Sequence, residues 1–170
     1  MICDNPVFER ILVAVDRSEA SRQAVRLGAG LAALTGARVA LVHVIDISKE
    51  FEPELGFADD LLTTDFRRPA DELLACSQSM FPSGLRIDRL IRDGDPPAEI
   101  LAAADNWGAD LIIVGNHSRG HGRLARLLFD GTAESIVRDA HCPVLTVGCA
   151  SVTPLPTTPF GPAHANSKHG

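Results

Sequence analysis

The sequence predicts an α/β fold in which helices cover a doubly wound, five-stranded parallel sheet. Short apolar runs alternate with stretches of helical periodicity between residues 10 and 147, which is the pattern of repeated β–α–β units. Most of these runs lack the alternation of a strand with one wet face, so we expect strands that are buried on both faces. The length of 170 residues suits one domain with tails, large enough to bury a core.

The composition argues against proteins that bind nucleic acid and proteins that span membranes. A hydrophobic fraction of 45% and a charged fraction of 22% are typical of globular proteins. The net charge of −6 argues against nonspecific binding to nucleic acid, which needs a basic face. No apolar run approaches the roughly 18 residues of a membrane span, and residues 1–6 lack the pattern of a signal peptide. We expect a cytoplasmic protein that binds neither nucleic acid nor membranes, with its four scattered cysteines as free thiols.

The first third of the chain predicts one βαβ unit. Residues 10–15 predict a buried strand, and Ser18 is a candidate N-cap for the following helix. Gly36 ends that helix, residues 37–46 predict a second strand, and a right-handed crossover makes the two strands parallel. One face of the helix is indicated by apolar residues at spacings of three and four: Ala20, Ala24, Leu27, Leu31 and Leu34.

The middle of the chain predicts a loop, a helix and an edge strand. Residues 48–57 have no clean period and are expected to form the loop. Residues 58–81 predict a helix that Pro69 either interrupts or begins. Residues 85–91 alternate like a strand that is exposed on one face, which suits the edge of a sheet.

Three further elements complete the alternation of strands and helices. Strands are predicted at residues 110–114 and 143–147, with a helix at about residues 132–138 between them. Before them, Pro96 and Pro97 begin a helix, because proline is tolerated in the first turn. The side of this helix that faces the core is predicted to consist of Ile100, Leu101, Ala104 and Trp107.

The end of the chain differs in composition from the rest. Residues 150–170 contain four prolines and few large apolar side chains, so they cannot bury enough surface to offset the entropy of ordering. We therefore expect a domain over residues 1–148 and a disordered tail over residues 149–170.

The candidate ligand site lies where the predicted strands end. In an open α/β sheet, ligands bind beyond the carboxyl ends of the strands, at the point where the strand order reverses. Residues 14–16, residues 43–46, residues 93–94 and the loop after Val114 are at such ends. A carboxylate at Asp16 suits ribose hydroxyls or a metal, and it equally suits the capping of the helix that follows.

A glycine-rich loop is the strongest sign of an anionic ligand. Residues 115–129 contain three glycines, three arginines and two histidines, and no acidic residue. The loop follows a strand and leads to a helix that begins at Thr132, so backbone N–H groups and the helix dipole converge on one place. This arrangement predicts a phosphate site.

Two known phosphate motifs do not fit this loop. A Walker P-loop needs lysine and then serine or threonine where His121 and Gly122 stand. A dinucleotide fingerprint fits residues 120–125, but it follows the fourth strand and no acidic residue ends residues 144–147.

The histidines do not indicate a metal site or a catalyst. His117 and His121 are four residues apart, but a glycine-rich loop does not hold them on one face as a helix would. We interpret His43, inside an apolar strand, as a satisfied core or crevice residue rather than a catalyst. No Ser/His/Asp or Cys/His set follows from the spacing.

Several segments together resemble the universal stress protein family. They are residues 10–19, 42–46, 94–96, 109–115 and 131–147, and the similarity extends over about residues 8–148 in order and spacing. The resemblance implies a flavodoxin- or HUP-like α/β domain, usually a homodimer that pairs through the last strand. One branch of the family binds ATP and the other does not.

The resemblance also implies a set of binding residues for ATP, with magnesium. The adenine and ribose end would be formed by Ala14, Val15 and Asp16, with Val44 against the adenine. The phosphates would be held by Gly115, Gly120, Gly122, Gly131 and Thr132.

The glycine loop departs from the family pattern, which is Gly-x2-Gly-x9-Gly-Ser/Thr. Ser118 stands where the second glycine is expected, and the nearest substitute, Gly120, gives Gly-x4-Gly-x10-Gly-Thr. Asp130 adds a carboxylate directly before Gly131, which is unfavourable near phosphates unless magnesium bridges them.

Two functions follow from the sequence. The first is an ATP-binding sensor or regulator of the stress response, with slow ATP hydrolysis at most, because no general base is apparent. The second is a nucleotide-free dimerisation or interaction module whose altered loop has lost the ligand.

Overall fold

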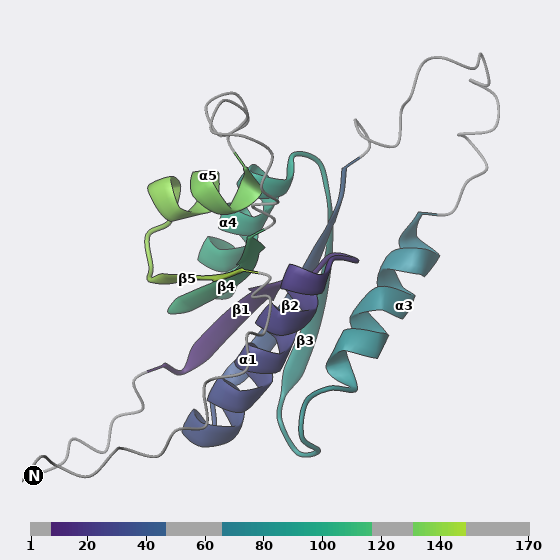
Figure 1. The fold of residues 1–170 in the computed structure, drawn as a ribbon, viewed down its shortest axis with the longest axis vertical. Coiled ribbons are helices and arrows are strands. Elements are labelled where there is room, and N and C mark those ends of the chain that lie inside the picture. Colours follow the sequence, from purple (N-terminus) through teal and green to yellow (C-terminus); the bar gives the residue numbers. More distant parts are fainter. Residues whose placement is uncertain (1–7, 47–65, 117–130, 149–170) are drawn as a thin grey trace, which may run out of the picture.

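The computed structural model describes residues 8–46, 66–116 and 131–148 (Figure 1). These residues form five strands and four helices, which alternate along the chain. In order they are β1 (Arg10–Ala14), α1 (Glu19–Thr35), β2 (Arg38–Ile45), α3 (Arg67–Gln78), β3 (Ile87–Asp93), α4 (Pro96–Trp107), β4 (Leu111–Asn116), α5 (Thr132–Asp139) and β5 (Val144–Gly148). The predicted loop over residues 48–57, the beginning of the helix predicted at residue 58, and the tail over residues 149–170 lie outside the described residues.

The strands form one parallel sheet in the order β3-β2-β1-β4-β5. From the central β1 the chain runs outward through β2 to β3 and then returns to place β4 on the other side of β1. The predicted doubly wound, five-stranded parallel sheet is therefore confirmed, and β3 lies at an edge as its alternation predicted. The order reverses between β1 and β4, which is where ligands bind in this architecture.

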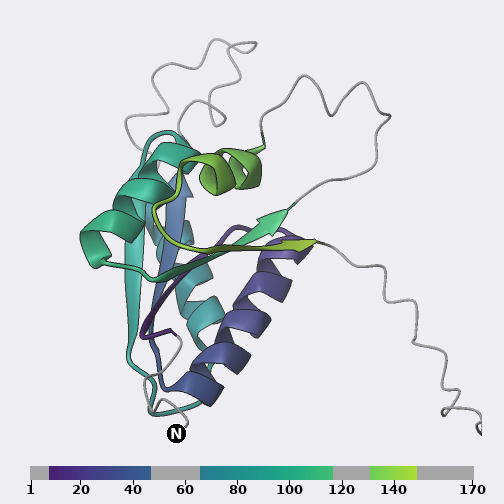
Figure 2. The same ribbon diagram turned by 90° about the vertical axis from the view of Figure 1, so that its left-hand side faces the viewer.

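Helices cover both faces of the sheet. Figure 2 shows α4 and α5 together on one side and α1 on the other, and α3 lies on the same face as α1. Along β1, Ile11 and Val13 belong to the core under α1, whereas Leu12 and Ala14 belong to the core under α4 and α5. All four side chains are buried. Burial on both faces explains why this strand shows no alternation of apolar and polar residues.

Local sequence signals set the ends of two helices. The Ser18 side chain caps α1 by accepting from the Ser21 N–H at 3.0 Å, and Asp95 caps α4 by accepting from the Ala98 N–H at 3.3 Å. Both helices end at a glycine in the left-handed region, Gly36 and Gly108, each with φ of 72°. The predicted cap at Ser18 and the predicted stop at Gly36 are therefore confirmed.

The predicted apolar face of α1 is only partly the buried one. Ala20 and Ala24 are buried, but Leu27 is 39% exposed and Leu34 is 85% exposed. The helix lies so close to the sheet that a Cβ atom on Gly28 would come within 2.9 Å of Val13 Cγ2. Small residues therefore face the sheet, and the leucines lie on the flank of the helix.

α3 and α4 differ from their predictions only in detail. α3 begins at Arg67, so Pro69 stands in its first turn, and the alternative in which proline begins the helix is correct. In α4, Ile100 and Ala104 are buried as predicted, whereas Leu101 and Trp107 are half-buried. No helix among the described residues is both long and apolar enough to span a membrane.

The indole of Trp107 joins the end of α4 to three strands. Its Nε1–H donates to the Asp88 carboxylate of β3 at 2.9 Å, and Arg38 of β2 donates to the same oxygen at 3.1 Å. The Arg10 guanidinium of β1 lies 4.6 Å from the ring centroid. Arginine at this place also meets the negative end of the α4 dipole.

Gly115 lies at a close contact between α1 and β4. A Cβ atom there would lie 2.6 Å from the Ser21 amide nitrogen and 2.7 Å from the Ala20 carbonyl carbon. Both are backbone atoms of the first turn of α1, so they cannot move aside as a flexible side chain does. Any side chain at residue 115 must therefore displace the helix from the sheet.

Replacing Trp107 with phenylalanine is expected to lower the free energy of unfolding by about 1–2 kcal/mol, because it removes the Nε1–H donor and weakens the ring that faces Arg10. Urea denaturation followed by circular dichroism measures this change, since the variant lacks the single tryptophan. His141→Ala, at a side chain that is 85% exposed, is the control and should change stability little. An unchanged midpoint in Trp107→Phe would contradict the structural role of the indole.

Replacing Gly115 with alanine is expected to cost about 1–3 kcal/mol of stability, because the added methyl group overpacks the contact with α1. Gly30→Ala, in α1, is the control, since a Cβ atom there meets nothing within 4 Å. It should stabilise the protein by roughly 0.5–1 kcal/mol through helix propensity. Thermal unfolding of the two variants should therefore shift in opposite directions, and equal shifts would refute the close contact.

Candidate functional site

A pocket of about 260 Å³ lies at the carboxyl edge of the sheet, over the point where the strand order reverses. Strand ends, the first turns of three helices and the chain that joins β1 to α1 all contribute to its walls. The lining residues are Ala14, Val15, Asp16, Ser21, His43, Val44, Asp46, Pro96, Ile100, Val114, Gly115 and Thr132.

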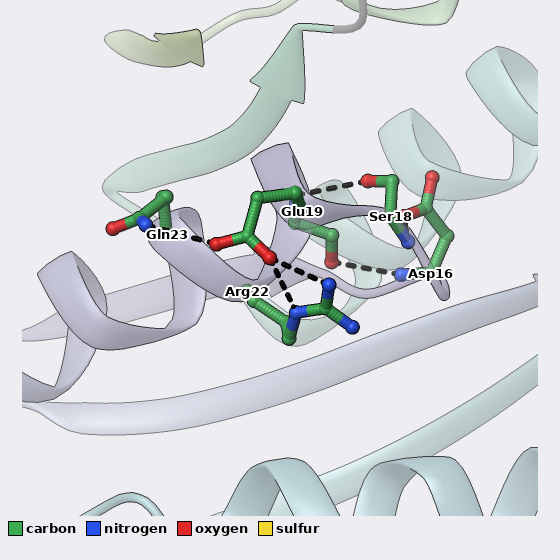
Figure 3. A network of polar contacts seen from close by, with 6 residues as sticks. Asp16, Ser18, Glu19, Arg22 and Gln23 are labelled. Atoms are coloured by element: carbon green, nitrogen blue, oxygen red, sulfur yellow. Dashed lines mark hydrogen bonds and ion pairs between the residues drawn. The ribbon is translucent and has the colours of Figure 1, made fainter. Parts of the chain in front are cut away.

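One wall is the turn between β1 and α1, which is held together by Ser21. The Ser21 hydroxyl accepts from the Asp16 N–H at 2.9 Å and donates to the Ala14 carbonyl at 3.4 Å. The Asp16 carboxylate accepts from the Ser18 N–H at 2.8 Å. These bonds fix the backbone of the turn before any ligand arrives (Figure 3).

The structure excludes the predicted alternative in which Asp16 caps α1. The side chain that caps α1 is Ser18, whose hydroxyl accepts from the Ser21 N–H. Asp16 stands two residues earlier, is exposed and lines the pocket. Its carboxylate braces the turn from outside the helix, so it is placed on the pocket wall rather than at the cap.

The charged side chains at the beginning of α1 do not line the pocket. Glu19 accepts from Arg22 and from Gln23 on the same helix, as Figure 3 shows. The hydrogen bond from Arg22, supported by that from Gln23, holds the pKa of the Glu19 carboxyl below its usual range. The Arg22 guanidinium is thus paired within the helix and does not supply positive charge to the pocket.

The end of β2 supplies the opposite wall. Val44 belongs to the core under α4 and α5, whereas His43 points to the other face of the sheet. The His43 Nδ1 atom lies 2.7 Å from the Val15 carbonyl oxygen. The side chain is half-buried and satisfied, as predicted, but it also lines the pocket together with Asp46.

The beginning of α5 faces the pocket from the side of β4. Gly131 is the N-cap residue and supplies no side-chain hydrogen bond, while its carbonyl accepts from the N–H groups of Glu134 and Ser135. Thr132, the first residue of the helix, lines the pocket. The positive end of the helix dipole is therefore beside the pocket.

The structure brings together most of the binding residues implied by the sequence. Ala14, Val15, Asp16, Val44, Gly115 and Thr132 all line the pocket. Gly131 adjoins Thr132 as the N-cap, and Gly120 and Gly122 lie outside the described residues. Gly115 has a second role that the sequence did not reveal, since its missing side chain makes room for α1.

Other lining residues were missed by the sequence analysis. Ser21 shows no distinctive spacing, and Pro96 and Ile100 reach the pocket only because α4 crosses above β2 and β1. Asp46 was noted as a strand end and is at the pocket, whereas Asp93, at the next strand end, instead forms an ion pair with Arg67.

The described part of the lining is acidic and apolar. It contains two carboxylates and one imidazole, without lysine or arginine. Among the described residues, no three histidine, cysteine or acidic side chains are grouped closely enough to hold a metal ion. The three arginines of the glycine-rich loop lie outside these residues.

Comparison with known proteins gives consistent matches over the same part of the chain. The model of the universal stress protein family matches residues 8–148. A universal stress protein of Thermus aquaticus is 32% identical over 142 residues, which cover 83% of this chain and 99% of the relative.

Solved structures show the same architecture. The universal stress protein UspA from Lactobacillus plantarum aligns with a TM-score of 0.62 and 25% identity, over 82% of this chain and 97% of that chain. A universal stress protein solved in complex with cAMP has the same fold, with a TM-score of 0.58 and 21% identity over 82% of this chain and 96% of that chain. With its doubly wound sheet and a match to the family model over residues 8–148, this chain belongs to the universal stress protein family.

Proposed function

We propose that this protein binds an adenine nucleotide in the pocket at the carboxyl edge and acts as a cytoplasmic sensor or regulator in the stress response. ATP with magnesium is the proposed ligand. The observation that supports the proposal most directly is that one pocket joins apolar walls, a braced carboxylate at Asp16 and the beginning of α5 at Thr132. A purine requires apolar walls, the ribose hydroxyl groups require an acceptor such as the Asp16 carboxylate, and the phosphates require a helix N-terminus such as that of α5.

The proposed orientation places the base and ribose at β1 and β2. Val44 and Ile100 offer apolar contact to a purine, and the Asp16 carboxylate accepts hydrogen bonds from ribose hydroxyl groups. Three N–H groups of the adjoining turn are already engaged: Val15 donates to Val42, Asp16 to Ser21, and Ser18 to Asp16. This turn therefore has few donors left for phosphate.

The phosphates would then lie toward α5. Gly131 leaves the helix N-terminus without a side-chain cap, and the Thr132 hydroxyl is beside the pocket. Asp16 and Asp46 repel a polyphosphate, so magnesium is expected to be required for tight binding of ATP. Gly120 and Gly122 are proposed to complete the phosphate site. We propose slow hydrolysis at most.

The family supports an adenine nucleotide as the first ligand to test. The universal stress protein of the same fold that was solved with cAMP is an example of a member that holds one. We further propose that residues 1–148 form the binding domain and that residues 149–170 form a separate tail.

The binding proposal is tested by isothermal titration of ATP with magnesium, with AMP and cAMP as comparison ligands. We expect a dissociation constant in the micromolar range, about −8 kcal/mol, and a rise in melting temperature on binding. Thr132→Val should weaken the binding of ATP while the fold is unchanged, because it removes one hydroxyl contact. Absence of both heat and thermal shift at millimolar nucleotide would favour the nucleotide-free interaction module instead.

The ribose contact is tested separately with Asp16→Asn, which keeps an oxygen for the Ser18 N–H but removes the charge. The variant should bind ATP about 5–15-fold more weakly, the loss expected for a hydrogen bond to a charged group. It should bind 2′,3′-dideoxy-ATP nearly as well as the wild type does, since that ligand lacks both ribose hydroxyls. Equal losses for the two ligands would place the role of Asp16 elsewhere.

We also propose a homodimer that pairs through β5, which lies at the edge of the described sheet. The Ile112 N–H donates to the Pro143 carbonyl, so by the alternation of a parallel ladder the Thr146 N–H points away from β4. Thr146→Pro removes that donor and should yield a folded monomer in light-scattering measurements. Thr146→Val keeps the donor and should stay dimeric. A dimeric proline variant would exclude pairing along this edge.

A further inference from the structure

His43 forms the last bond between β1 and β2 at the pocket. The backbone pairing of these strands extends to Ala14 and Val42, and the Val15 N–H still donates to the Val42 carbonyl at 2.8 Å. The Val15 carbonyl then meets a side chain, because His43 Nδ1 lies 2.7 Å from its oxygen. The imidazole thus ties the chain to β2 at the residue where it leaves the sheet.

The chemistry of this contact fixes the position of the proton. A carbonyl oxygen only accepts hydrogen bonds, so Nδ1 must carry the hydrogen. In the neutral ring, Nε2 is then unprotonated, and in the charged ring Nδ1 still donates. The bond to Val15 therefore forms in both protonation states of His43.

This hydrogen bond acts on the pocket wall that carries Asp16, whose carboxylate is proposed to bind the ribose. Val15 and Asp16 are consecutive, and both line the pocket with His43 itself. The Asp16 N–H is held by Ser21 on the side of α1, while the Val15 carbonyl is held by His43 on the side of β2. Without the imidazole, the carbonyl of the buried Val15 loses its bond, and the Val15 N–H is left as the remaining tie of the wall to β2.

We propose that His43 is a positioning residue for the nucleotide: through Nδ1 it holds Val15, and with it Asp16, in the place that the ribose requires. This role rests on the proposed function. It assigns to the histidine no contact with the ligand, and it separates the role of Nδ1 from that of Nε2. A wall fixed in advance binds more tightly because the ligand does not have to order it.

Two amide side chains separate the roles of the ring nitrogens. The asparagine amide nitrogen is attached to Cγ, as Nδ1 is, whereas the glutamine amide nitrogen is one bond further out, as Nε2 is. His43→Asn therefore replaces the donor to Val15, and His43→Gln replaces the outer nitrogen. His43→Ala removes both. The matched control is His141→Ala, which removes an exposed imidazole outside the pocket lining.

Titration of ATP with magnesium is carried out on the full chain and on these variants, with melting temperatures measured without ligand. His43→Ala is expected to bind about tenfold more weakly, and His141→Ala to bind as the wild type does. His43→Asn should recover binding to within about threefold of the wild type, and His43→Gln should remain near the alanine variant. Nitrogen NMR of the free protein should show the neutral ring protonated at Nδ1.

The opposite results overturn the proposal. If His43→Ala binds as tightly as the wild type, the tie has no effect on the ligand. If His43→Gln recovers binding and His43→Asn does not, the histidine contacts the ligand through Nε2. A neutral ring protonated at Nε2 removes the bond to Val15 on which the role depends. A wild-type protein that binds none of the nucleotides overturns the proposed function itself, whatever the variants do.

Discussion

The contact between the first turn of α1 and the end of β4 fixes the geometry of the carboxyl edge. At Gly115 the absence of a side chain allows the backbone of Ala20 and Ser21 to lie against the strand. That approach brings the Ser21 hydroxyl within reach of both the Ala14 carbonyl and the Asp16 N–H. The turn after β1 is therefore rigid because of a glycine about a hundred residues further along the chain.

The two ends of the pocket are built differently. On the side of β1 and β2, hydrogen bonds from Ser21, Ser18 and His43 satisfy the backbone and hold it in one place. On the side of α5, Gly131 leaves the helix without a side-chain cap. A braced wall suits the part of a ligand that is recognised by shape, and an uncapped helix N-terminus suits an anion. This asymmetry is the physical reason for placing the base at one end and the phosphates at the other.

The negative charge of the described lining constrains how the phosphates of the proposed ligand can be held. Asp16 and Asp46 are the carboxylates of the described lining, and Arg22 of α1 pairs with Glu19 instead of lining the pocket. The helix dipole contributes only about half an elementary charge. A polyphosphate in this pocket would therefore need a counter-ion, or the arginines of the sequence between β4 and α5, to balance the two carboxylates. The departures of that sequence from the family pattern thus bear directly on the proposed function.

Most of the fold could be predicted because its signals are local. The apolar run of β1, the serine and aspartate caps of α1 and α4, and the glycines that end these helices each act within a few residues. The prediction of the α1 face was less accurate, since leucine usually indicates a core. Where α1 packs against the sheet at Gly28, even a Cβ atom would be crowded, and this crowding is visible only in three dimensions.

The sequence by itself determined the order of the elements, the parallel sheet and the edge of the sheet at which the pocket lies, because periodicity, caps and crossover handedness are properties of short segments. It also identified Asp16 and Thr132 as members of one site through the resemblance to the family. Only the tertiary structure decided that Gly115 serves the packing of the helix and that His43 holds Val15. These assignments depend on distances between residues far apart in the chain, which no local pattern encodes.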